Sequence, residues 1–265
     1  MASKTSARMI RSRRRAPAAA AAAPESGKIA QCGTQCSSCN LRALCTPCCG
    51  LSRLEMEVAD RLVFSRLRLR RGEALYRSGD RFTSLYAVRN GFFKSTALLE
   101  NGRDQVTGFS MTGEVLGMDG IGPGQHNCDV TALEDGEVCA IPFAGLQQLA
   151  RELPGLQRHF HRTLSREIVR ETGVMLLLGR MTADERLAVF LLNLAQRFAA
   201  RGYSPSEFNL RMTREEIGSY LGLTLETVSR TLSKFQQEGL IGVQQKCIRI
   251  VDSAGLQQVL GREPG

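Results

Sequence analysis

The pattern of apolar and polar positions along the chain changes near Phe143. Before this residue, short segments alternate partly between apolar and polar residues and are separated by glycines, which predicts the strands of an antiparallel sandwich or barrel. Strands are expected at 73–76, 84–88, 91–99, 105–109 and 137–141. A short helix is expected earlier, at 51–62, where apolar residues recur with helical spacing.

Beyond Phe143 the apolar spacing is helical, first at 146–152 and then over a long segment from about 154 to 178. In the long segment, one set of positions is spaced four, three, four and three residues apart, like the seam of a coiled coil. The set is Leu164, Ile168, Glu171, Met175 and Leu178. The spacing is equally typical of a helix that packs inside its own domain, so the pattern alone leaves a homodimer open.

Glu171 differs from the other seam positions because it is charged. In a parallel dimer with a two-fold axis, a seam residue meets its own copy, so two carboxylates would lie together at low dielectric. A dimer formed through this seam is therefore expected to be weak.

Residues 212–240 have the pattern of a helix-turn-helix. Thr213 and Glu216 have the capping-box spacing at the start of a first helix, and Gly222 interrupts the chain after it. Thr224 can then cap a second helix. The pattern alone is also compatible with a helical hairpin that has no special function.

The second helix is predicted to have one packing face and one face free to read DNA. Arg230 suits O6 and N7 of a guanine, Glu226 can accept from N4 of a cytosine, and Ser229 suits either a base or a phosphate. Residues near the start of such a helix are those that reach base edges. Together with the capping residues Thr213 and Thr224, these three are the expected DNA-binding residues.

Six of the nine cysteines lie within residues 31–50. Cys32, Cys36, Cys39 and Cys45 have the spacing C-x3-C-x2-C-x5-C, close enough for one loop to turn several thiolates toward one metal centre. Thiolates select zinc, copper(I) or iron-sulfur clusters, and the loop alone does not separate zinc from iron-sulfur. A disulfide knot is disfavoured because the chain is long enough to form a core and no secretory signal is recognisable.

Composition and charge add further limits. The hydrophobic content of 43% and the charged content of 23% are typical of a globular protein. Since no apolar run is long enough for a membrane helix, we expect a cytoplasmic protein with no membrane partner. Residues 1–30 carry seven basic residues and one acidic residue, so this tail contributes +6 of the net charge of +9. The tail has little to bury and is expected to be disordered.

Several longer motifs follow one another in a fixed order. They are CSSCNLRALCTP, SGDRFTSLYAVRNGFFKS, VCAIPF, LLLGRMTADERLAVFLLNLAQRF and MTREEIGSYLGLTLETVSRTLSKFQ. From Cys32 to about Val251 the chain resembles the CRP/FNR superfamily, and within it the oxygen-responsive FNR type. The resemblance implies an α+β fold with an N-terminal antiparallel β-roll of the cyclic-nucleotide-binding, jelly-roll kind. A long dimerisation helix and a C-terminal winged helix-turn-helix would follow, with the hairpin pattern at 241–251 as the wing.

The resemblance also implies a 4Fe-4S cluster as cofactor. Three N-terminal metal ligands of the family match Cys36, Cys39 and Cys45, and one distant ligand matches Cys139 in VCAIPF. The residues alone would instead have indicated that Cys139 is a buried strand cysteine. The chain departs from the family pattern in having Cys48 and Cys49 just after the cluster loop and Cys128 in the roll. Substitution of Cys48 or Cys49 as a ligand stays an alternative, and we interpret both as spare thiols.

The expected function, by resemblance, is an oxygen-sensing transcription regulator and not an enzyme. It would dimerise while the cluster is intact, bind palindromic promoter DNA with TTGAT-type half-sites and control anaerobic gene expression with RNA polymerase as a partner. The expected division is a basic tail at 1–30, a cysteine loop at 31–50, the β-roll at 51–145, the dimerisation helix region at 146–180, the winged helix-turn-helix at 181–252 and a C-terminal segment at 253–265.

Three other functions fit the sequence less well. Cyclic-nucleotide binding is not expected, although the superfamily includes cyclic-AMP receptors, because residues 113–134 contain no arginine or lysine to pair with a buried phosphate. An electron carrier would not need the helix-turn-helix, and no nucleophile-base pair, phosphate loop or flavin signature indicates catalysis. A regulator with a structural zinc would be colourless and stable in air, which distinguishes it from an iron-sulfur protein.

Overall fold

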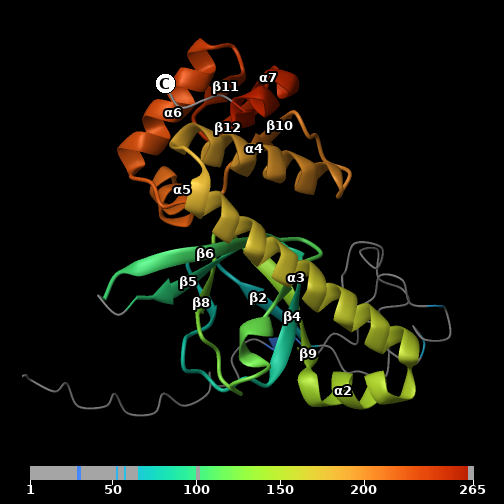
Figure 1. Cartoon of the computed structure of the whole chain (residues 1–265). Helices are drawn as coiled ribbons and strands as arrows, with labels where there is room; N and C mark the ends of the chain where they lie inside the picture. Colours follow the sequence, from blue (N-terminus) through green and yellow to red (C-terminus); the bar gives the residue numbers. More distant parts are fainter. Residues whose placement is uncertain (1–28, 31–51, 53–56, 58–64, 100–101, 262–265) are drawn as a thin grey trace, which may run out of the picture.

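The computed structural model describes residues 29–30, 52, 57, 65–99 and 102–261. The described chain forms a β-roll, a long helix and a helical domain with a small sheet, which confirms the predicted α+β architecture (Figure 1). The basic tail at 1–28, the cysteine loop at 31–50 and most of the helix predicted at 51–62 lie outside the described residues.

The β-roll consists of two antiparallel sheets with the strand orders β1-β2-β9-β4-β7 and β3-β8-β5-β6. The first sheet contains β1 (Ile29–Ala30), β2 (Ser65–Leu69), β9 (Gly136–Pro142), β4 (Ser84–Asn90) and β7 (Val115–Leu116). The second contains β3 (Ala74–Tyr76), β8 (Asp129–Ala132), β5 (Phe92–Leu98) and β6 (Asp104–Met111). Each predicted strand segment therefore overlaps a strand, whereas β1, β2, β7 and β8 were not predicted.

The two sheets enclose an apolar core. Val88 and Val138 from the first sheet pack with Phe93 and Val130 from the second, and all four are buried. The turn between β4 and β5 requires glycine, because Gly91 has a φ of 91° and a Cβ there would lie 2.9 Å from the Cα of Gly136.

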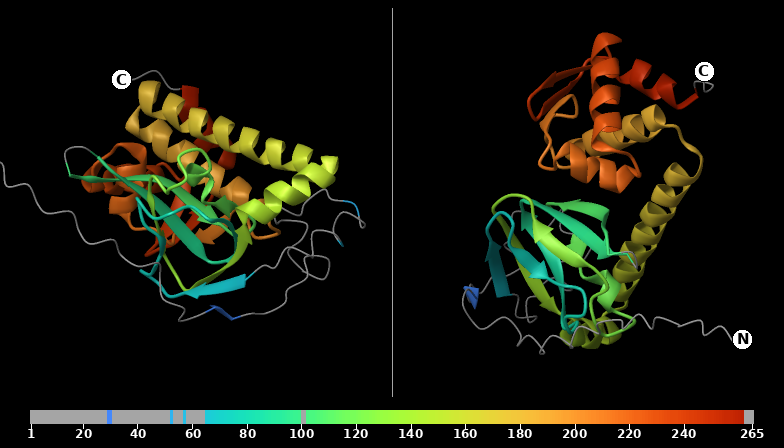
Figure 2. Two further views of the ribbon diagram at one scale, coloured as in Figure 1. Left: turned by 90° about the horizontal axis from the view of Figure 1, so that it is seen from below. Right: turned by 90° about the vertical axis from the view of Figure 1, so that its left-hand side faces the viewer.

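Helix α2 (Phe143–Glu152) follows the roll directly and leads into α3 (Pro154–Arg180). Helix α3 runs alongside the roll and reaches the helical domain, as Figure 2 shows from two further sides. The predicted long helix is thus confirmed, and it extends two residues beyond 178. A capping box at Thr182 begins α4 (Ala183–Ala199) immediately afterwards.

The C-terminal domain is a winged helix-turn-helix, as predicted. Its helices α5 (Arg214–Leu221) and α6 (Leu225–Gln237) pack against α4. Its small sheet has the order β10-β12-β11. The remaining elements are β10 (Glu207–Asn209), β11 (Ile241–Gln244), β12 (Cys247–Ile250), α7 (Ser253–Gln258) and the short 3-10 helices η2 (Met118–Gly120) and η3 (Val259–Gly261).

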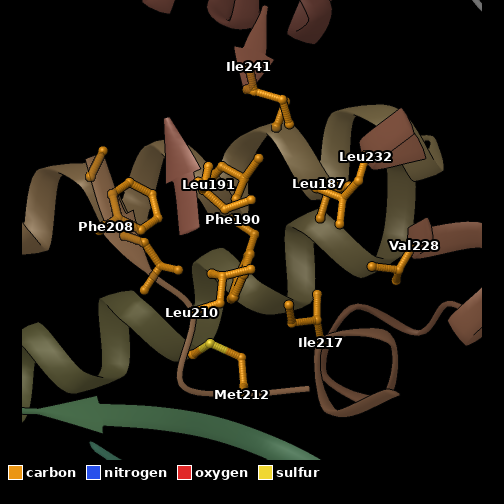
Figure 3. Close-up of a cluster of buried hydrophobic side chains, with 14 of the residues drawn as sticks. Leu187, Phe190, Leu191, Phe208, Leu210, Met212, Ile217, Val228, Leu232 and Ile241 are labelled. Atoms are coloured by element: carbon orange, nitrogen blue, oxygen red, sulfur yellow. The ribbon is translucent and has the colours of Figure 1, made fainter. Parts of the chain in front are cut away.

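One apolar core holds the helix-turn-helix together. Leu187 and Leu191 of α4 meet Ile217 of α5 and Val228 and Leu232 of α6, and all five side chains are buried (Figure 3). Full burial of an aliphatic side chain of this size contributes about 1.5–3 kcal/mol. The helix-turn-helix geometry is therefore fixed by packing on α4.

This core continues into the roll. Phe92 of β5 and Val106, Phe109 and Met111 of β6 belong to the same buried cluster as the helices of the DNA-binding domain. The roll and the C-terminal domain are consequently packed against each other and not merely joined through α3. Among the described residues, no helix is long and apolar enough to cross a membrane.

Candidate nucleic-acid interface and its contacts with the roll

Helix α6 presents a polar face away from the core. The side chain of Thr224 caps its start by accepting from the backbone N–H of Thr227. Glu226 and Arg230 are exposed, and Ser229 is half-buried. The predicted separation of a packing face and a free face is therefore confirmed, while the contact of these residues with DNA stays a prediction.

Helix α5 is capped at its own start and contacts α6 through one side chain. Thr213 and Glu216 form the predicted capping box, in which the Thr213 hydroxyl accepts from Glu216 N and the Glu216 carboxylate accepts from Thr213 N. Arg214 donates from Nη1 to Oγ of Ser229 over 3.2 Å. Ser229 is thus already oriented by a cation on the neighbouring helix, which sequence reasoning did not anticipate.

Helix α4 fixes the rest of the motif through two charged side chains. Asp184 accepts from the Lys234 ammonium over 2.5 Å and from the Thr231 hydroxyl over 3.2 Å, which ties α6 to α4. Arg186 donates to the carbonyls of Leu178, Met181 and Leu221. Since Leu178 belongs to α3 and Leu221 to α5, Arg186 connects the end of the long helix to the helix-turn-helix.

A polar contact also joins the roll to α5. The Lys94 ammonium of β5 lies 2.7 Å from the Glu216 carboxylate, and Val106 N of β6 donates to the Ser219 hydroxyl over 2.9 Å. Burial alone would raise the pKa of Glu216, but hydrogen bonds from Lys94 and Thr213 outweigh it, so the pKa of this carboxyl is lowered. Glu216 therefore both completes the capping box of α5 and forms an ion pair with Lys94 of the roll.

Glu114 of the roll is the centre of a second ionic contact, which joins the roll to α3 and α4. Its carboxylate accepts from Arg197 over 2.6 and 3.1 Å and from Arg201 over 2.7 Å, and the Arg170 guanidinium lies 3.8 Å away. Burial alone would raise the pKa of Glu114, but Arg197, Arg201 and Arg170 together lower it. We define Glu114, Arg170, Arg197 and Arg201 as the Glu114 network, which joins the roll, α3 and α4.

The predicted seam of α3 is largely uncovered by the described residues. Ile168 and Met175 are 66% and 74% exposed, Glu171 and Leu178 are also exposed, and Leu164 is half-buried. An apolar stripe that faced the chain's own core would be buried, so the exposure disfavours that alternative. The pairing of the seam with a second copy stays a prediction.

Cys139 is the one predicted metal ligand among the described residues, because Cys36, Cys39 and Cys45 lie outside them. It is half-buried on β9, and its cross-strand neighbour on β2 is Arg66. Arg66 in turn pairs with Ala30 of β1. The backbone that leads into the cysteine loop therefore lies two strands away from Cys139 in the same sheet.

The other described cysteines differ from Cys139 in their surroundings. Cys128 lies beside Asp119 and the stacked rings of Tyr76 and His126. Burial and the neighbouring Asp119 carboxylate raise the pKa of the Cys128 thiol to about 12, so the thiol is protonated at neutral pH. Within the described residues, no group of three or more His, Cys, Asp or Glu side chains is arranged to hold a metal ion.

A β-roll joined through one long helix to a winged helix-turn-helix defines the class of DNA-binding transcription regulators. Residues 185–259 match the Crp-like helix-turn-helix domain family, and residues 66–152 match the cyclic nucleotide-binding domain family. The chain belongs to the CRP/FNR superfamily of transcription regulators. The second match identifies the fold of the roll and does not demonstrate that it binds a cyclic nucleotide.

Curated relatives place the chain more closely. It is 47% identical over 228 residues to the transcriptional regulatory protein btr of Bordetella pertussis, covering 86% of this chain and 94% of that protein. It is 42% identical over 230 residues to the fumarate and nitrate reduction regulatory protein of Escherichia coli, covering 87% and 92%. The transcriptional activator protein FnrA of Stutzerimonas stutzeri is 44% identical over 238 residues, covering 89% and 97%.

A solved structure agrees with this placement. FixK2 from Bradyrhizobium japonicum superposes with a TM-score of 0.70 at 31% identity, covering 77% of this chain and all of that chain. The protein is therefore an FNR-type transcription regulator with a DNA-binding helix-turn-helix, and it is not an enzyme.

Proposed function

We propose that this regulator senses oxygen through a 4Fe-4S cluster held by Cys36, Cys39, Cys45 and Cys139. The single observation that carries the proposal is the strand order β1-β2-β9, which brings the chain that enters the cysteine loop into the sheet of Cys139. Four thiols are a donor set that suits such a cluster. When bound, the cluster would supply an oxygen-labile link between the N-terminal loop and the roll.

The exposed seam of α3 supports a homodimer as the DNA-binding form. Ile168 and Met175 would pack against their copies, while the two Glu171 carboxylates would repel each other. Such a dimer is weak by itself, so a small bias from the sensor region is enough to shift the population between monomer and dimer. We propose that the units 51–145, 146–180 and 181–252 act as sensor, dimerisation and DNA-binding parts.

Two recognition helices related by a two-fold axis would read a palindromic promoter site with half-sites one helical turn apart. In a TTGAT-type half-site, Arg230 would donate to the guanine, and Glu226 would accept from the paired cytosine. Ser229, which Arg214 orients, and the capping residues Thr213 and Thr224 would contact base edges or phosphates in the proposed complex. We further propose that the protein acts in the cytoplasm, with RNA polymerase as its partner, to control anaerobic gene expression.

The test uses the full chain purified without oxygen. We expect a coloured, dimeric protein with bound iron and sulfide that binds TTGAT-palindrome DNA, and that bleaches and becomes monomeric after exposure to air. Cys139→Ser should lose iron and dimerise poorly, whereas the matched control Cys247→Ser, on β12 of the DNA-binding domain, should behave as wild type. A colourless, air-stable wild-type protein that holds zinc would contradict the oxygen-sensing part of the proposal.

A further inference from the structure

Three arginines surround one carboxylate on the sheet that carries Cys139. The Nε atoms of Arg66, Arg68 and Arg89 lie 3.5, 3.6 and 3.4 Å from the carboxylate oxygens of Glu137. Three cations around one anion leave an excess of positive charge on this face. The side chains of Arg66 and Glu137 are 22% and 15% exposed, so water screens their charges less than it would at the surface.

The strand register places this charge beside Cys139. Arg66 pairs directly with Cys139 across β2 and β9, and Glu137 precedes Cys139 by two residues, so all three side chains project from the same face of the sheet. Directly opposite residues of an antiparallel pair have Cβ atoms about 4.5–5.5 Å apart. The Cβ atom of Arg66 is therefore expected within a few ångströms of the Cβ atom of Cys139, the proposed ligand.

Two polar atoms in this group lack hydrogen bonds. Nε of Arg66 and Oε1 of Glu137 are buried and lie 3.5 Å apart as an ion pair, but neither atom forms a hydrogen bond with the residues that the structure describes. A buried N–H group that faces a carboxylate without forming a hydrogen bond keeps its capacity to donate, and an ion or ligand is one kind of group that completes such a site. An arginine N–H is a suitable donor to thiolate or sulfide sulfur, and hydrogen bonds to sulfur are a recognised control on iron-sulfur sites.

We infer that Arg66, supported by Arg89, is a positioning residue that holds an anionic iron-sulfur cluster at Cys139 and that Glu137 opposes this attraction. The inference rests on the proposed function. Four thiolates outweigh the positive charge of a 4Fe-4S core, so the ligated cluster is an anion and suits a cationic, donor-rich surface. Arg66, Arg89 and Glu137, on β2, β4 and β9, are not ligands and would act on the cluster through their charge.

The experiment compares Arg66→Gln and Glu137→Gln in the full chain, each reconstituted without oxygen. The measured quantities are the iron and sulfide retained after desalting and the rate of iron loss to a chelator in the absence of oxygen. Removing one partly buried charge should change this rate about threefold to tenfold. Arg66→Gln should release iron faster, Glu137→Gln should release it more slowly, and Arg66→Lys should recover part of the loss.

Arg68→Gln is the matched control. Arg68 is on the same strand and also faces Glu137, but its side chain is 81% exposed, so its loss should change the rate less than about twofold. Thermal unfolding of the metal-free variants reports any general loss of fold. A purely structural ion pair would make Arg66→Gln and Glu137→Gln change iron release in the same direction, because each breaks the same contact.

The outcomes separate this inference from the proposed function. A wild-type protein that holds iron and sulfide, with Arg66→Gln and Glu137→Gln both at the wild-type rate or both faster, would overturn the inference alone. A wild-type protein that retains no iron and sulfide would overturn the proposed function and the inference together. Opposite changes in the two variants, with Arg68→Gln near wild type, support the inference.

Discussion

Replacing Glu114 with glutamine tests whether the Glu114 network holds the roll against the DNA-binding domain. The substitution keeps the size of the side chain and removes its charge. In the wild type the Glu114 side chain is 20% exposed and the Arg201 side chain is 11% exposed, so the contact is largely shielded from water. Glutamine would leave Arg197 and Arg201 buried beside a neutral amide.

The expected loss follows from this burial. Removing one partner of a buried, hydrogen-bonded charge pair destabilises a protein by about 3–5 kcal/mol, because the remaining charge loses its compensation. A surface pair contributes about 0–1 kcal/mol. Since the Glu114 network retains some exposure and Arg170 lies at 3.8 Å, we expect about 3 kcal/mol less free energy of unfolding for Glu114→Gln.

The loss should depend on pH in a defined direction. The pKa of Glu114 is lowered in the folded state from its ordinary value of 4.5. Its ionised form therefore stabilises the fold fully above that ordinary value, and the contribution disappears as the pH falls through the lower, folded-state pKa. The difference in stability between wild type and Glu114→Gln should be constant near neutral pH and shrink in acid.

The assay is urea unfolding of both proteins, with Glu134→Gln as the matched control. Glu134 also joins the roll to the DNA-binding domain, through Arg211 at 3.0 Å, but this pair is more exposed and should contribute less than about 1 kcal/mol. If Glu114→Gln and Glu134→Gln lowered the free energy of unfolding equally, or if the Glu114→Gln loss grew in acid, the reasoning from buried charge would be wrong.

Three further predictions concern the seam and the recognition helix. Glu171→Ala should give a dimer in air, with a dissociation constant at least about tenfold lower, because it removes repulsion worth about 1.4 kcal/mol or more; a monomer in sedimentation would remove this argument. Arg170→Gln should raise the dissociation constant of the dimer in the wild-type chain, because Arg170 lies 3.9 Å from the Glu171 carboxylate and partly neutralises it. In the Glu171→Ala chain the same substitution should change the dissociation constant little; equal effects in both chains would show that the two residues are not coupled. Arg230→Ala should lower affinity for TTGAT-type DNA by about 1–3 kcal/mol and relax preference at the guanine, measured by titration against mutated half-sites; uniform weakening on all sites would instead indicate a phosphate contact.

The helix-turn-helix could be predicted closely because its signals are local. Thr213 and Thr224 cap the two helices as their spacing indicated, and Gly222 adopts the left-handed conformation that ends the first. The strand β2 was missed although Arg66 and Arg68 alternate with leucines, a period of two that the sequence did contain. The short strand β8 offers four residues, too few for a clear pattern.

The contacts between the roll and the DNA-binding domain could not be predicted. Glu114 and Arg197 are 83 residues apart, and Lys94 and Glu216 are 122 residues apart, so no local spacing relates them. Their pairing depends on how the roll packs against α4 and α5, which only the folded chain determines. For Cys139, likewise, the residues alone indicated a buried strand cysteine. Its position directly opposite Arg66 on β2 follows only from the register of the folded sheet.

Arg170 gives the seam a physical connection to the rest of the molecule. Its guanidinium pairs with Glu167 of α3 and lies 3.8 Å from Glu114 and 3.9 Å from Glu171. Because one cation serves carboxylates of the roll and of the seam, any movement that draws Arg170 toward Glu114 leaves Glu171 less neutralised and increases repulsion between two copies. In the proposed dimer, the strength of the seam would therefore depend on how the roll packs against α3, and the proposed sensor region would need no direct contact with the seam to control it.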